Sequence, residues 1–241
     1  MNQHEQVINV MEKAGGFATL GFLYKNVDVS KWSTKTPFAS IRRIVQNEKF
    51  FVKIKPGLWA LKDYIKNLPV EVYPDEEISS EKKNEFDHTY YQGLLVETGN
   101  FKQYDTFTPS QDKNKKYLGK TLYNSTSMDE IFNFTHSEIL RYARTVDVVW
   151  FNQRRMPSAF FEIEHSTDMK NSLGKFVELQ DFYSHFFIVA DISRKSEYED
   201  KIKLSTFKDI KDRVKFADYN KVAEWHEHSY KLSNNEIEKI F

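Results

Sequence analysis

Three acidic residues interrupt two apolar segments in the second half of the chain. Asp147 lies in the segment 146–151, and Glu162 and Glu164 lie in the segment 158–165. Both segments have the composition of buried β-strands. Successive side chains of a strand alternate between its two faces, so Glu162 and Glu164 share one face. A tight turn between the segments would bring Asp147 beside that pair.

Carboxylates gathered in this way need compensating charge. Like charges in a partly buried sheet repel one another and lose hydration, at a cost on the order of several kcal/mol unless a divalent cation or a basic partner occupies the cluster. The chain has no cysteine, which excludes zinc–thiolate sites, iron–sulfur clusters and cysteine nucleophiles. Ligation by oxygen alone favours Mg²⁺ or Mn²⁺. The alternative is structural: the glutamates lie on an edge strand and Asp147 forms a salt bridge.

The order of these acids resembles the PD-(D/E)xK nuclease core in its ExE form, which is known from restriction endonucleases. The resemblance rests on Asp147, a short hairpin and Glu162-Ile163-Glu164, and it extends from about His88 to Asp191. It implies that Asp147 and Glu162 are metal ligands and that Glu164 takes the place usually held by a lysine. It also implies that Glu97, near the end of the preceding predicted helix, supports the site.

Two departures from this motif change what the site can do. Val146 stands where the motif usually has a proline, and the motif lysine is missing. A carboxylate cannot supply positive charge to a transition state, so we expect Lys175, on a helix predicted over 173–183, to supply it. Gln180 on the same helix is a further candidate. The run His165-Ser166-Thr167 beside the motif also resembles a prokaryotic group of nuclease-like proteins.

Positive charge is concentrated near the N-terminus. The whole chain has 35 basic and 35 acidic residues, but the stretch 31–62 has eight basic residues and one acid. This stretch predicts a helix with Pro37 in its first turn, followed by a hairpin around Pro56-Gly57. Two further helices are predicted upstream, over 3–14 and 20–26.

The order of these elements resembles a winged helix-turn-helix. The run Thr36-Pro37-Phe38-Ala39-Ser40-Ile41-Arg42-Arg43, followed by Gly57-Leu58-Trp59-Ala60-Leu61, resembles the HARE-type winged helix. A helix of this kind can lie in the major groove of DNA while the wing meets phosphates. The residues that we expect to contact DNA are Arg42, Arg43 and Gln46 on the helix, and Lys53 and Lys55 on the wing. The alternative is a winged helix that contacts other proteins.

An acidic segment separates the two regions. Between Glu71 and Asp87 there are seven acids and two lysines, which predicts an exposed connection. We therefore expect a winged-helix domain over 1–68, a linker over 69–87 and a nuclease-like domain over 88–241. Within the last, the lysine-rich segment 105–124 predicts a long loop. The predicted fold is α+β or α/β, in which the winged helix precedes a mixed β-sheet flanked by helices.

Together these interpretations predict a Mg²⁺- or Mn²⁺-dependent DNA endonuclease, in the first instance a type II restriction endonuclease that cleaves double-stranded DNA as a homodimer. One alternative is a nuclease that requires modified bases. Another is a transcriptional regulator whose nuclease-like domain only binds or dimerises. The longest wholly apolar run, 186–190, is far short of the roughly 20 residues of a membrane-spanning helix, and the first residues lack the apolar stretch of a secretory signal. We therefore expect a soluble protein of the prokaryotic cytoplasm, without a membrane partner.

Overall fold

The computed structural model describes residues 2–74 and 77–238, with side chains up to Ser233. The chain divides into two compact units. The first comprises Met1–Ile78 and Glu227–Phe241, and the second comprises Ser79–His226. Residues 227–241, which the sequence analysis assigned to the nuclease-like domain, therefore group with the N-terminal unit. Among the described residues, no helix is long and apolar enough to cross a membrane.

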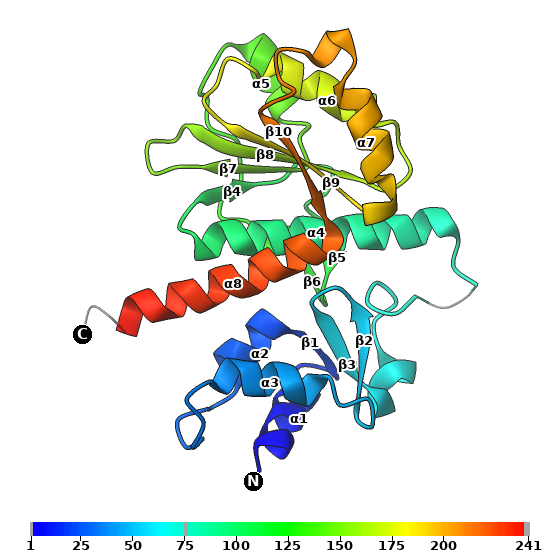
Figure 1. Cartoon of the computed structure of the whole chain (residues 1–241), viewed down its shortest axis with the longest axis vertical. Helices are drawn as coiled ribbons and strands as arrows, with labels where there is room; N and C mark the ends of the chain where they lie inside the picture. Colours follow the sequence, from blue (N-terminus) through cyan, green and yellow to red (C-terminus); the bar gives the residue numbers. More distant parts are fainter. Residues whose placement is uncertain (1, 75–76, 239–241) are drawn as a thin grey trace. The chain divides into compact units, whose positions relative to one another are not determined.

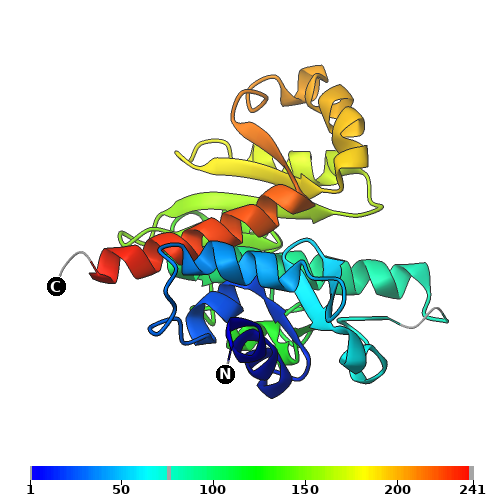
Figure 2. The same ribbon diagram turned by 60° about the horizontal axis from the view of Figure 1, so that its bottom comes forward.

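The first unit packs three helices beside a small sheet (Figure 2). The predicted helices and the predicted hairpin are confirmed. The sequence analysis missed a short strand, β1, which pairs with the second hairpin strand and gives the sheet the order β1-β3-β2. The elements are α1 (Gln3–Lys13), β1 (Phe17–Thr19), α2 (Leu20–Asn26), α3 (Pro37–Val45), β2 (Phe51–Lys55), β3 (Leu58–Leu61) and a 3₁₀-helix (Lys62–Asn67).

Local sequence explains where these helices begin and which face they bury. Asn2 caps α1 by accepting from the Glu5 amide, and the Glu5 side chain accepts from the Asn2 amide in return, which is a capping box. Pro37 occupies the first turn of α3, where its missing N–H group is not needed. Ile41 and Val45 on α3 are fully buried, so the opposite face of this helix is left for polar contacts.

The second unit is built on a five-stranded mixed sheet (Figure 1). Its strand order is β10-β9-β8-β7-β4. β9 pairs in parallel with β8 and β10, whereas β7 pairs antiparallel with β8 and β4. The predicted mixed sheet is therefore confirmed. The strands are β4 (Asp105–Phe107), β7 (Val148–Phe151), β8 (Pro157–Glu164), β9 (His185–Ala190) and β10 (Val214–Asp218).

Helices cover both faces of this sheet, as predicted (Figure 1). α4 and the start of α8 lie on one face, where Trp225 packs on Trp150 and Phe161. α5 and α6 lie on the other, where Phe160 and Phe176 belong to the main apolar core. The helices are α4 (Ser80–Phe101), α5 (Ser137–Ala143), α6 (Met169–Glu178), α7 (Lys195–Ile202) and α8 (Tyr219–Glu238). The remaining elements are the hairpin of β5 (Lys116–Tyr117) and β6 (Lys120–Thr121), and the 3₁₀-helices Leu122–Asn124, Ile192–Arg194 and Ser205–Phe207.

Several predicted boundaries differ from this structure. The second half of the segment 69–87, predicted as a linker, is helical because Ser79 caps α4 and Glu81 lies in its first turn, both of which stabilise a helix start. Residues 75 and 76 of that segment lie outside the described residues. α6 begins and ends earlier than predicted, since Asp168 caps it. The sequence analysis did not predict β10.

A glycine allows α4 to approach the β5–β6 hairpin closely. A Cβ atom at Gly93 would lie 2.2 Å from the ring of Tyr117, which is buried. We therefore expect Gly93→Ala to lower the free energy of unfolding by about 2 kcal/mol, measured as a lower Tm in thermal unfolding. Gly174→Ala on α6 is the matched control, because its Cβ would meet no atom within 4 Å. An equal Tm for the two variants would contradict this packing.

Candidate active site

The hairpin of β7 and β8 brings Asp147 and Glu162 together. Val148 pairs with Phe161 across the two antiparallel strands, so Asp147, the residue before β7, lies opposite Glu162. The Asp147 Oδ2 atom accepts a hydrogen bond from the Ile163 amide at 2.7 Å. This bond fixes the Asp147 carboxylate against β8, at the end of the strand that carries the two glutamates.

α6 supplies partners for both glutamates. The Ser172 hydroxyl lies between them, 2.8 Å from Glu162 Oε2 and in contact with Glu164. Lys175 Nζ donates to the two carboxylate oxygens of Glu162 at 2.8 and 2.9 Å, and to the Thr145 carbonyl at 2.8 Å. Ser172 and Lys175 are three residues apart and so lie on one face of the helix. The structure thus places Lys175, the candidate for the missing motif lysine, against Glu162.

Glu164 is enclosed by the segment that follows β8. It is 3% exposed and accepts a hydrogen bond from the Thr167 hydroxyl. Arg194 Nη1 lies 3.9 Å from Glu164 Oε2, and Arg194 is itself held by Glu197 at 2.8 Å. The sequence analysis did not identify Arg194 as a neighbour, because it lies in a 3₁₀-helix beyond β9 and no local pattern links it to β8.

Burial and repulsion set the electrostatics of the facing acids. Burial and the Asp147 carboxylate raise the pKa of Glu162 to about 8, against the opposing effect of Lys175. Burial also disfavours ionisation of Asp147, but His88 beside it holds the pKa of Asp147 below its ordinary value. The two facing carboxylates, Glu162 buried and Asp147 partly buried, therefore have pKa values shifted in opposite directions.

A second group of polar side chains meets Asp147 from α4 and from the segment between β4 and β5. His88 Nε2 lies 3.4 Å from Asp147 Oδ1. Gln92, one turn further along α4, donates to Asp112 Oδ2 at 2.9 Å and to the Asp147 carbonyl at 3.0 Å. Lys115 pairs with Asp112 at 2.6 Å. The sequence analysis missed this group; the spacing of His88 and Gln92 on one helix face was the available signal.

Glu97 belongs to a different cluster. It lies nine residues after His88 on α4, which is about 13 Å further along the helix axis. Burial disfavours its ionisation, but its hydrogen-bonding partners hold the pKa of Glu97 below its ordinary value. The family resemblance implied that Glu97 supports the site at Asp147, but this separation along α4 places it elsewhere. The partners of Glu97 are the Tyr117 hydroxyl at 2.9 Å, Lys120 at 3.2 Å and His226 Nε2 at 2.9 Å.

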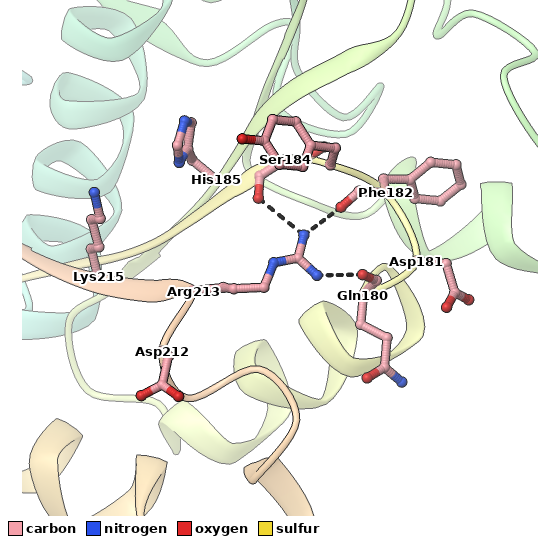
Figure 3. Close-up of a pocket in the computed structure, with 9 residues that line it drawn as sticks. Gln180, Asp181, Phe182, Ser184, His185, Asp212, Arg213 and Lys215 are labelled. Carbon is pink, nitrogen blue, oxygen red and sulfur yellow. Dashed lines mark hydrogen bonds between the residues drawn. The ribbon is translucent and has the colours of Figure 1, made fainter.

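Gln180 also lies apart from the acids, in a pocket of about 530 Å³ (Figure 3). Arg213 reaches across this pocket and donates to the backbone carbonyls of Gln180, Phe182 and Ser184. These bonds hold the turn after α6 near the start of β10. They involve the backbone of Gln180 and not its side chain, which points away from Arg213 (Figure 3). The pocket is therefore explained by the packing of the turn.

The residues expected to contact DNA lie on α3 and on the hairpin of the first unit. Arg42 is held by Glu227 of α8 at 3.2 Å, and Glu227 is buried and also accepts from the Tyr24 hydroxyl at 2.7 Å. Arg42 therefore has a structural partner, although 45% of its side chain is exposed. Lys55 is half-buried. Arg43, Gln46 and Lys53 are exposed as well.

Residues 67–240, more than half of the chain, match the protein family described as Type II restriction enzyme NmeDI C-terminal domain. The matched range contains α4, the hairpin of β7 and β8, and α6, and so it includes every side chain found around Asp147. No curated protein and no solved structure matches the chain.

Proposed function

Because the chain belongs to the family described as Type II restriction enzyme NmeDI C-terminal domain, we propose that it is a metal-dependent endonuclease that hydrolyses phosphodiester bonds of double-stranded DNA. The observation that carries the proposal is the meeting of Asp147, Glu162 and Lys175 at one end of the hairpin. Two acids and an amine are the groups of a PD-(D/E)xK site. In this chain the amine comes from α6 and not from the strand.

Asp147 and Glu162 would hold Mg²⁺ or Mn²⁺. The donor set fits because both groups are carboxylates, both are fixed, and burial leaves Glu162 poorly compensated without a cation. When bound, the ion would neutralise charge on the scissile phosphate and lower the pKa of an attacking water. The chain's own contribution is to hold the two acids in place, Asp147 through the Ile163 amide and Glu162 through Ser172.

Lys175 and Glu164 would act on the water and on the phosphate. Lys175 Nζ is aimed by the Thr145 carbonyl and Glu162, and a fixed ammonium group stabilises negative charge that develops in a transition state. Glu164 shares the Ser172 hydroxyl with Glu162. From that position it would orient the attacking water or share a second ion.

The first unit would bind the DNA as a winged helix of the HARE type. Three helices precede the β2–β3 hairpin, β1 joins the hairpin, and basic residues are concentrated on these elements. In this proposal α3 lies in the major groove and the hairpin contacts phosphates. A double-strand cut needs two active sites, so two copies of the chain would act together as a homodimer.

Replacing Arg43 and Lys53 together by alanine should weaken DNA binding and reduce its salt dependence. Each phosphate contact that is lost lowers the slope of log affinity against log salt by about 0.9, which fluorescence anisotropy at several salt concentrations measures. Lys13→Ala on α1 is the matched control at an exposed lysine. An unchanged slope in the double variant would argue against the proposal that the first unit binds DNA.

Arg42→Ala should lower Tm, because buried Glu227 loses a partner.

One experiment tests the function and separates it from two others. The purified protein is incubated with modified and with unmodified genomic DNA, each with and without Mg²⁺. We expect discrete fragments that require Mg²⁺. Fragments from modified DNA alone would indicate a modification-dependent nuclease. No fragments from either DNA, despite tight binding, would contradict the proposal and indicate a regulator with a non-catalytic nuclease-like domain.

A further inference from the structure

A second set of metal-binding side chains meets at Asp147 and does not include Glu162. One ligand atom each from His88, Asp112 and Asp147 lies within 4.8 Å of the other two. Two donors on opposite sides of a divalent cation are about 4.2 Å apart. A small movement of the side chains would therefore bring all three into contact with one ion.

The side chain of Gln92 points into this set and is only partly satisfied. Gln92 is completely buried. Its Nε2 donates to Asp112 and to the Asp147 carbonyl, whereas its Oε1 has no hydrogen-bond partner within the part of the chain that the structure describes. In this orientation Nε2 faces the set and Oε1 faces away from it, so the protein alone satisfies only one end of this buried amide. If the amide turned over, Oε1 would face two other oxygens, an arrangement that a cation would stabilise.

We propose that His88, Asp112 and Asp147 form a site for a divalent transition metal such as Mn²⁺ or Co²⁺, with Oε1 of Gln92 as a further ligand after its amide turns over. An imidazole ligand favours transition metals, whereas Mg²⁺ prefers oxygen ligands. Lys115, which neutralises Asp112 in this structure, moves aside when the ion binds. The inference deepens the proposed function and rests on it for the use of Asp147 in cleavage.

Asp147 is placed to link this ion to the proposed catalytic ion. Its Oδ1 atom faces His88 and its Oδ2 atom faces the β8 backbone beside Glu162. A carboxylate that presents different oxygens to two neighbouring donor sets can bridge two cations, as in two-metal phosphodiester hydrolysis. The consequence for the enzyme is a preference for Mn²⁺ over Mg²⁺, set by His88.

The test uses the full chain and Mn²⁺ alone, without DNA. Pulsed electron paramagnetic resonance detects an imidazole nitrogen bound to Mn²⁺, and the spectrum of free Mn²⁺ gives the affinity. We expect a nitrogen signal in the wild type that His88→Gln lacks, and an affinity at least about tenfold lower in His88→Gln and Asp112→Asn. Glu162→Gln should retain the nitrogen signal. His136→Gln, at an exposed histidine, is the matched control and should leave signal and affinity unchanged.

A gain-of-affinity variant keeps the test independent of folding defects. Gln92→Glu adds a carboxylate to the set, and since affinity rises with the number of charged ligands, we expect Mn²⁺ to bind about tenfold more tightly. A wild type without a nitrogen signal, or Mn²⁺ binding unaffected in both His88→Gln and Asp112→Asn, would overturn the proposal. Cleavage assays in parallel separate the two hypotheses: cleavage without the nitrogen signal overturns this site alone, and the signal without cleavage overturns the proposed function alone.

Discussion

Asp147→Asn is expected to abolish DNA cleavage while leaving the fold and DNA binding intact. Asparagine keeps an oxygen that can accept from the Ile163 amide, as Asp147 Oδ2 does at 2.7 Å, so the pairing of β7 with β8 should persist. The substitution removes the negative charge that a divalent ion requires. A loss of about 4 kcal/mol of transition-state stabilisation lowers the rate about a thousandfold. Initial rates of Mg²⁺-dependent plasmid cleavage measure this loss, and anisotropy without metal measures binding.

Glu162→Gln and Asp209→Asn complete this test. Glu162→Gln should lose cleavage to a similar degree, and its Tm should stay close to that of the wild type, because burial already favours the neutral form of this side chain. Asp209→Asn changes an exposed acid of the same unit and should cleave as the wild type does. Cleavage by Asp147→Asn at the wild-type rate would contradict the assignment of the site.

The positions of the three acids could be predicted because they depend on local rules. The spacing of Glu162 and Glu164 fixes their common face through strand alternation, and the short turn of the hairpin determines which residue lies opposite. Lys175 could be anticipated for a similar reason, because the helix that follows β8 packs back on the sheet. These inferences use neighbours in sequence, and the contacts of Ser172 and Lys175 with Glu162 agree with them.

The contacts of α4 with Asp147 could not be predicted in the same way. A helical pattern shows which residues share a face, but it does not show which turn of the helix lies against a strand end. The family resemblance implied Glu97 as the acid of this helix, whereas packing places His88 and Gln92 at Asp147. Asp112 was missed because its segment was expected to be a loop, and its position depends on long-range packing that no local motif encodes. β10 was missed for the same reason, since its partner β9 lies beyond an intervening helix.

Lys175→Met is expected to reduce cleavage by about a thousandfold, which is the effect of removing one fixed group that stabilises developing charge. The lysine is the ammonium group that touches both oxygens of Glu162, and methionine has a similar length without the charge. Loss of the pair should also lower the free energy of unfolding, by about 1 kcal/mol, because Glu162 loses the hydrogen bonds of Lys175 while burial favours its neutral form. Single-turnover cleavage at saturating Mg²⁺ measures the rate, and urea unfolding measures the stability.

Lys175→Arg separates a catalytic role of this lysine from a structural one. Arginine keeps the positive charge and can pair with Glu162, so stability should return to near the wild-type value. Its planar guanidinium group cannot reproduce the position of a single ammonium nitrogen, so the cleavage rate should stay low. Lys170→Met, at an exposed lysine on α6, is the matched control and should change neither quantity. If Lys175→Arg restored both stability and the full rate, Lys175 would be only a counter-ion that holds Glu162. Another positively charged group would then have to stabilise the negative charge of the transition state.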